Sequence, residues 1–327
     1  MATEHFSPAW VEDSQIDAGL RQLESLELDP RHGLFGPGAM YWEVNRHTLP
    51  YFLGAVQSVQ FQLCHPWVAT AIKEHSKIMS DPRARARQTY FFLWSIIYGD
   101  RELVLKRARA LYRIHQRVQG EVPEAAGDFA EASHYQANEM HAMLWVHITA
   151  VWSRVYFYAQ LVRSLTSVEK NRLVQEAKIY ALCFGLPSDM HPENWEALEQ
   201  YMDSVLNSGQ LAATAAGLEV RRFLENSIPR PVRSSVWLLI TLGLPQNIRN
   251  MLQQPEDNEQ NRARFAKARK RFQLLNRLLP GKLRYVPAYH EALARLAGRD
   301  RPDWLTSKLL KASIGQPRLV SRQQAAP

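Results

Sequence analysis

The chain has 327 residues, of which 46% are hydrophobic and 10% aromatic, and its formal net charge is +8. This composition excludes a disordered chain and predicts a globular protein with a large core. The only two cysteines, Cys64 and Cys183, are too few for a disulfide framework or a cysteine-rich zinc site.

The N-terminal stretch MATEHFSPAW lacks the basic start and apolar run of a secretory signal. Every apolar stretch is shorter than the ~20 residues needed to cross a bilayer. We therefore expect a cytoplasmic protein with reduced thiols. The positive net charge is compatible with an anionic ligand, a membrane surface or nucleic acid, and by itself selects none of them.

Helical periodicity dominates from residue 11 onward, and strand signals are sparse. A Gly/Pro-rich loop, LFGPGAMYW, precedes a helix predicted over 42–63, which Pro66 stops. Proline and Asp-Pro or Gly-Asp pairs then delimit three further helices. These are predicted over 66–79, 82–98 and 100–120.

An acidic loop over 121–133 separates this part from a long helix predicted over 134–165. Later helical patterns cover 167–184, 194–207, 210–226, 232–242 and 259–278. No self-similar period appears, so we do not expect a repeat solenoid. The pattern predicts one all-α, multi-helix domain.

Several of these helices carry polar residues on an apolar face. His75 continues the line of Val68 and Ile72, and His147 continues the line of Met140 and Leu144. An inward arginine is costly unless it meets an anion or many hydrogen-bond acceptors. The polar residues on these faces are His75, Arg85, Thr89, His115, His147 and Arg154.

Each of these residues also has a simpler interpretation. A lone core histidine is more often bonded to a carbonyl than to a metal, Arg85 could pair with Glu43, and Thr89 could bond its own helix. The combination of inward imidazoles, arginines and aromatics suits a large planar ligand with an apolar body, an anionic rim and a central metal. Haem has these three properties.

Other cofactor chemistries fit less well. A di-iron carboxylate bundle needs two Glu-x-x-His motifs, and only Glu131 to His134 matches, within the acidic loop. The chain has no Cys-x-x-Cys-His, His-Glu-x-x-His, Gly-x-Ser-x-Gly, Gly-x-Gly-x-x-Gly or Walker sequence.

The order of motifs resembles a known family. The segments are GPGAMYWEVNR, CHPWVATAIKEHS, DPRARARQT, YGD, IHQRVQG and YQANEMHAMLWVHIT. Together they resemble the MpaB-type oxygenase family, which includes the latex-clearing rubber oxygenases. The resemblance covers residues 34–210 and continues more weakly through PRPVRSSVW and the basic segment near 260–285.

The resemblance implies an all-α, globin-like core that encloses a haem b pocket and attacks carbon–carbon double bonds with O2. By motif position, His115 matches the proximal iron ligand, Arg85 and Thr89 match a catalytic Arg-x-x-x-Thr pair near the haem, and His147 matches a further haem-pocket histidine. We add His75 and Arg154 as cofactor contacts from their helix faces.

Two departures from the family pattern count against rubber as the substrate. Gln88 stands where rubber oxygenases carry a lysine beside the threonine, and His47 stands where many relatives have an acid. We therefore expect a hydrophobic unsaturated substrate that is terpenoid- or lipid-like. The haem domain is predicted over 34–285, after an N-terminal extension over 1–33 that contains a helix; residues 286–327 form a C-terminal helix and a disordered tail.

Two alternatives stay open. A non-catalytic haem carrier or sensor would have iron held by two histidines, such as His115 and His147. A peripheral membrane protein would use the basic segment 259–285, in which Phe265, Phe272 and Leu275 share one side. We favour docking of that side on the core, and we expect no nucleic-acid partner.

Overall fold

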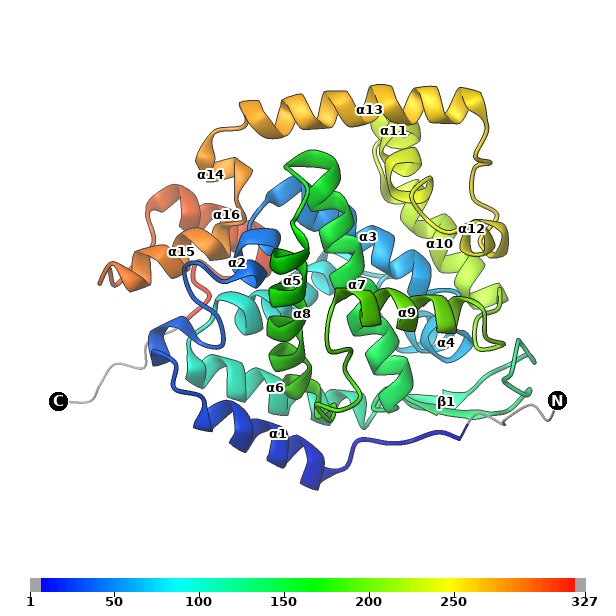
Figure 1. Cartoon of the computed structure of the whole chain (residues 1–327), viewed down its shortest axis with the longest axis horizontal. Helices are drawn as coiled ribbons and strands as arrows, with labels where there is room; N and C mark the ends of the chain where they lie inside the picture. The colour runs from blue at the N-terminus through cyan, green and yellow to red at the C-terminus, as the bar shows by residue number, and fades with distance from the viewer. Residues whose placement is uncertain (1–6, 321–327) are drawn as a thin grey trace.

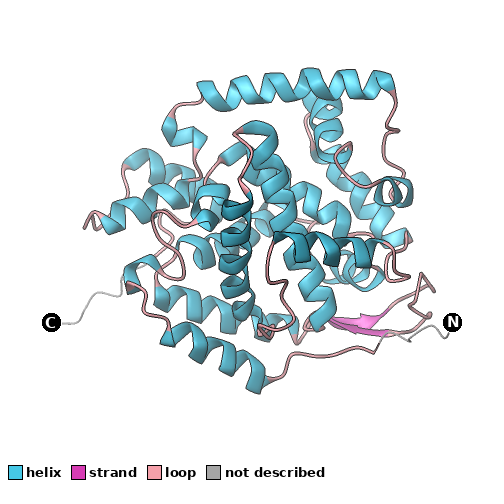
Figure 2. Ribbon diagram, viewed as in Figure 1, coloured by secondary structure: helices cyan, strands magenta, loops and turns pink. Residues whose placement is uncertain are grey.

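The computed structural model describes residues 7–320, and over this range the fold is all-α apart from one short hairpin (Figures 1 and 2). The helices of the first half are α1 (Asp13–Ser25), α2 (Met40–Asn45), α3 (Thr48–Gln62), α4 (Pro66–His75), α5 (Pro82–Tyr98), α6 (Arg101–His115) and α7 (Met140–Leu161). Those of the second half are α8 (Ser167–Ala181), α9 (Trp195–Leu206), α10 (Ala215–Ser227), α11 (Arg230–Thr241), α12 (Gln246–Met251), α13 (Glu259–Leu278), α14 (Gly281–Arg284), α15 (Pro287–Leu296) and α16 (Trp304–Ile314). Two 3₁₀ turns, η1 (Pro30–His32) and η2 (Leu182–Phe184), complete the set.

The centre of the molecule is the pair α3 and α7, which pack along each other. Phe61 of α3 lies edge-on to Trp145 of α7, with ring centroids 6.0 Å apart. Gly54 of α3 lies so close that a Cβ there would be 2.9 Å from the carbonyl oxygen of Ser153. Because α7 is buried along most of its length, it carries the longest continuous part of the core.

The helices α5 and α6 form an antiparallel pair around the turn at Gly99 and Asp100. The Asp81 side chain accepts from the backbone N–H of Ala84 at 3.0 Å, and the Asp100 side chain accepts from that of Leu103 at 2.9 Å. These caps satisfy backbone donors that a helix start leaves open. The pairing sets the first turns of α5 beside the last turn of α6, which ends at His115 and not at residue 120.

The hairpin corrects the predicted helix over 134–165. Strand β1 (Gln119–Glu121) pairs antiparallel with β2 (His134–Gln136), with Gln119 opposite Gln136, so that the helix begins only at Met140. Each strand has three residues, which is too short for an alternating hydrophobic pattern. The long loop between them also lacks the two-residue turn that marks tight hairpins.

Other boundaries also differ from the prediction. The helix predicted over 42–63 is broken into α2 and α3, with His47 preceding α3 in an extended conformation. The segment after 286 contains two helices, α15 and α16, where one was expected, and the short helices α12 and α14 were not predicted. Residues 321–327 of the predicted disordered tail lie outside the described residues.

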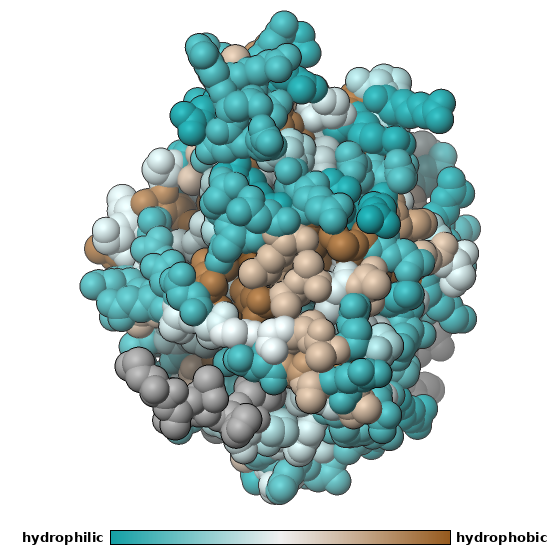
Figure 3. Space-filling view, turned by 90° about the vertical axis from the view of Figure 1, so that its right-hand side faces the viewer, coloured by the Kyte–Doolittle hydropathy of each residue, from teal (hydrophilic) through white to brown (hydrophobic). Residues whose placement is uncertain are grey.

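The surface is mostly hydrophilic on the side that carries α10, α11 and α12. Figure 3 shows this face with apolar side chains gathered in a central hollow and polar ones around them. Within residues 7–320, no helix combines the length and the apolar character that a membrane crossing requires.

Candidate functional site

The first turns of α5 hold an arginine without an acidic partner. The Arg85 guanidinium donates through Nε to the Ser76 hydroxyl and through Nη1 to the Thr89 hydroxyl, both at 2.8 Å. Thr89 in turn donates to the backbone carbonyl of Arg85 at 2.9 Å. No carboxylate among the described residues forms an ion pair with Arg85. Burial lowers the pKa of Arg85, which means that the surroundings disfavour its charged form.

His115, at the end of α6, faces this arginine. Burial, with a smaller contribution from the nearby charge of Arg85, lowers the pKa of its imidazole to about 4. The ring is therefore neutral at pH 7, when one of its nitrogens carries a free electron pair. Its side chain is half-buried, and neither ring nitrogen makes a hydrogen bond to any residue within 7–320.

An aromatic path extends from this polar end. Phe92 follows Thr89 by three residues and Arg85 by seven, so all three share one side of α5. The ring of Phe92 lies 6.2 Å from that of Phe184 in η2. Both phenylalanines pack against the main core and still keep partial access to solvent. The side of α5 that carries Arg85 therefore continues as an apolar surface.

The path ends at a pair of histidines. The His147 ring stacks on Tyr180, with interplanar angle 8°, and its centroid lies 6.1 Å from that of Phe184. Its Nε2 lies 3.3 Å from Nε2 of His191, and the ring also contacts the backbone carbonyl of Ala177. Burial, with a contribution from His191, lowers the pKa of His147 well below the ordinary value.

The structure therefore brings together three of the predicted residues, Arg85, Thr89 and His115, and connects His147 to them through phenylalanine. His147 has contacts on both sides of its ring, so it would have to leave them to bind a metal. His115 has no such contacts to lose.

The other two predicted residues lie apart from this cluster. His75 was expected on an apolar face, but α4 ends at this residue and the side chain is exposed, with Nε2 3.0 Å from the Tyr135 hydroxyl. Arg154 is buried, as expected, but it lies over the Tyr51 ring at 3.7 Å and donates to the Asn45 amide oxygen at 2.9 Å.

The two positions that depart from the family pattern have different surroundings. Gln88 is exposed on α5. His47 is buried between the rings of Tyr158 and Tyr285, and its Nε2 lies 3.8 Å from a carboxylate oxygen of Glu43. Glu43 thus contacts His47 and Arg46, and it is not the partner of Arg85 that the sequence allowed.

Sequence reasoning missed Ser76, Phe184 and His191. Ser76 follows α4 directly and anchors Arg85, and no periodic pattern marks it. His191 lies in the loop before α9, where helix-face analysis does not apply. Phe184 could have been found, because it ends a predicted helix with an aromatic residue next to a glycine.

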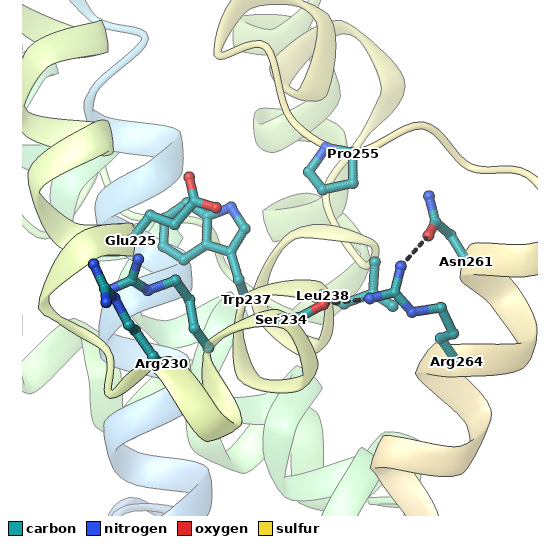
Figure 4. Close-up of a pocket in the computed structure, with 9 residues that line it drawn as sticks. Glu225, Arg230, Ser234, Trp237, Leu238, Pro255, Asn261 and Arg264 are labelled. Atoms are coloured by element: carbon teal, nitrogen blue, oxygen red, sulfur yellow. Dashed lines mark hydrogen bonds between the residues drawn. The ribbon is translucent and has the colours of Figure 1, made fainter.

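Cavities also lie elsewhere in the described part of the chain. One, of about 260 Å³, lies between α11 and α13 and is lined by Arg230, Ser234, Trp237 and Arg264 (Figure 4). Figure 4 shows the Arg264 guanidinium between Ser234 and Asn261, to which it is hydrogen-bonded. Another, of about 280 Å³, lies beside Arg46 and Tyr289. Within residues 7–320, no group of three or more His, Cys, Asp or Glu side chains could hold a metal ion.

Comparison with known proteins adds one finding. A family model described as "ER-bound oxygenase mpaB/B'/Rubber oxygenase, catalytic domain" matches residues 42–274. No curated protein and no solved structure matches the chain. The matched range contains α3 to α12 and most of α13, and with them all six predicted site residues.

Proposed function

Because the chain belongs to the family of mpaB-type and rubber oxygenase catalytic domains, we propose that it is a haem b-dependent oxygenase that acts with O2 on a hydrophobic unsaturated substrate. The proposal includes a haem pocket of globin-like kind between α5, α6 and η2. Family membership supports the oxygenase class. The haem and the substrate class are supported by the residues of the site.

The observation that carries the proposal is the pair formed by Arg85 and His115. A neutral imidazole without a hydrogen-bond partner is a metal ligand in the required protonation state. A half-buried guanidinium without a carboxylate is a cation that still needs an anion. A haem, with iron at its centre and carboxylates at its rim, complements both groups, and its iron needs only one or two protein ligands.

Each side chain has a distinct part in this arrangement. His115 would hold the iron through one ring nitrogen, and Arg85 would bind a carboxylate of the porphyrin rim. Thr89 and Ser76 are positioning residues, because they hold the guanidinium through its own N–H groups. When bound, haem iron supplies the activation of dioxygen.

The apolar side of the site favours a hydrophobic substrate. Phe92 and Phe184 present partly accessible aromatic surface next to the polar end, and such surface binds hydrocarbon chains and excludes water. Gln88 is exposed, so this side chain would not hold the cofactor. We therefore propose an oxygen-accessible iron and cleavage of a C=C bond in a terpenoid- or lipid-like substrate.

The first experiment is an absorption titration of the purified chain with haemin. The wild type should bind one equivalent, with a Soret band that shifts when the reduced protein is exposed to carbon monoxide. His115→Ala should weaken haemin binding at least tenfold. His134→Ala, an exposed histidine of β2, is the matched control and should bind like the wild type.

Three results would contradict the proposal in whole or in part. Unchanged haemin stoichiometry and spectrum in His115→Ala would remove this residue from the iron. A wild-type chain that takes up no haemin would remove the haem altogether. Loss of binding in His147→Ala alone would move the ligand to the other end of the site.

A further inference from the structure

The helix α13 carries an unusual concentration of positive charge. From Gln260 to Arg284 the sequence contains nine lysines and arginines and no acidic residue. Figure 1 shows α13 running along one edge of the molecule. On its N-terminal half, Arg262 pairs with Asp257, and Arg264 bonds Ser234 and Asn261.

Farther along the helix, Arg269 donates to the Gln160 amide oxygen at 3.2 Å, but four other cations are unpaired. Lys267, Lys270, Arg271 and Arg277 are exposed, and none of them forms an ion pair or hydrogen bond through its side chain with another residue of the described chain. Phe265, Ala268 and Phe272 dock on the core, as expected for the apolar side of this helix, but Leu275, which was expected on the same side, is 44% exposed. The four unpaired cations therefore project from the opposite side.

Leucines lie among these cations, on the solvent side. Leu274 is 56% exposed and Leu278 is 70% exposed. They are four residues apart and so follow each other along one side of the helix. Lys270 precedes Leu274 by one turn, and Arg271 precedes Leu278 by seven residues. A helix that exposes leucine among unpaired cations has the composition of an interfacial helix.

Neighbouring elements extend the apolar part. Leu283 of α14 is 43% exposed, and Trp304, the first residue of α16, is 69% exposed. Lys282 of α14 donates to the Asp303 carboxylate at 2.5 Å, which joins the start of α16 to α14. Of the eleven large hydrophobic side chains that are exposed within residues 7–320, seven lie between Leu274 and Leu305. Single exposed apolar residues scattered over a surface need no explanation, but the concentration of seven of them in this segment needs one.

We propose that this surface, made of the outer side of α13 from Lys267 to Leu278 together with Leu283 and Trp304, docks on an anionic phospholipid bilayer. Leu274, Leu278, Leu283 and Trp304 would enter the headgroup–acyl boundary, and the four unpaired cations would contact lipid phosphates. A bilayer satisfies both features, since it offers negative charge and an apolar layer at adjacent depths. A nucleic acid offers the charge but no layer for the leucines. The inference does not depend on haem binding.

The test is cosedimentation of the full chain with vesicles of phosphatidylcholine alone and with vesicles that also contain phosphatidylglycerol. We expect binding to the anionic vesicles only. The double variant Leu274→Gln/Leu278→Gln and the double variant Lys270→Gln/Arg271→Gln should each lower the partition coefficient at least tenfold. All four positions are exposed, so circular dichroism should be unchanged.

Matched controls use exposed residues elsewhere. Val168→Gln, at a position that is 78% exposed on α8, and Arg21→Gln/Lys106→Gln should bind like the wild type. The proposal is overturned if the wild type does not bind anionic vesicles. It is also overturned if only the charge variant loses binding, or if duplex DNA binds the wild type and the leucine variant equally well at the same salt concentration, because a bare polyanion would then suffice.

Discussion

At the scale of single residues, the decisive feature is a charge that the protein itself does not neutralise. Arg85 is held by two hydroxyl groups, and both are neutral acceptors. Its positive charge acts on His115. Burial and the charge of Arg85 together lower the pKa of this histidine to about 4. Arg85 and His115, which would both hold a haem, therefore interact electrostatically in the protein without haem. This interaction can be measured through the pKa of His115.

Arg85→Gln should raise the pKa of His115, because it removes the neighbouring positive charge. The value should stay below 6.5, because burial is the larger cause and remains. The measurement is an NMR titration of the histidine ring protons. Arg83→Gln changes an exposed arginine of the same helix and should leave the titration unchanged.

If Arg85 also binds a haem carboxylate, the haemin affinity of Arg85→Gln should be about tenfold weaker than that of the wild type, or about 1.4 kcal/mol. An unmoved His115 titration in Arg85→Gln would contradict the coupling.

At the scale of elements, the two central helices α3 and α7 approach each other closely. Glycine at position 54 allows this contact, since a Cβ there would lie 2.9 Å from the Ser153 carbonyl oxygen and 3.1 Å from Cδ of Arg154. The carbonyl belongs to the backbone and cannot rotate away. A side chain at this position must therefore push the two central helices apart.

Gly54→Ala should destabilise the chain by about 1–2 kcal/mol. Overpacking costs about 1–3 kcal/mol, and the better helix propensity of alanine returns up to about 1 kcal/mol. Urea unfolding followed by circular dichroism measures the difference. The matched control is Gly281→Ala in α14, where nothing lies within 4 Å of the new Cβ, and it should unfold within about 0.5 kcal/mol of the wild type. Equal stability of both variants would argue against the tight α3–α7 contact.

At the scale of the whole molecule, buried neutral histidines make the fold sensitive to acid. Burial lowers the pKa values of His65 and His191 to about 4, and it also holds the pKa of His147 well below the ordinary value. The unfolded chain binds protons at these groups near pH 6.5, whereas the folded chain does not. The contribution of these histidines to the free energy of unfolding is therefore fully present above pH 6.5, and it is lost as the pH falls toward 4.

His65→Phe should reduce this loss. His65 is 1% exposed, and no hydrogen-bond partner of its ring nitrogens lies within the described chain. Between pH 7.5 and pH 5, the free energy of unfolding should fall by about 2 kcal/mol less in this variant than in the wild type, because the titrating imidazole is gone. The measurement compares the free energy of urea unfolding of the two proteins at both pH values. A stability difference that is the same at pH 7.5 and pH 5 would show that His65 does not contribute.

The sequence by itself determined the elements whose signals are local. Helix α13 has the predicted boundaries, 259 and 278, and α5 begins at Pro82 and ends at Tyr98 as predicted. Capping side chains, prolines and the helical period act over a few residues, so they can be recognised without the rest of the chain. The family resemblance rests on the same kind of local pattern, and the matched family model confirms it.

The tertiary structure alone decided which surfaces are covered and which groups meet. It turned His75 to solvent, paired His147 with His191, separated α2 from α3, and left Leu274 and Leu278 exposed beside a docked apolar side. Helical spacing specifies that residues share a side, but the neighbour that covers that side comes from a distant segment. The partner of a polar group is distant for the same reason, so neither could be derived from periodicity.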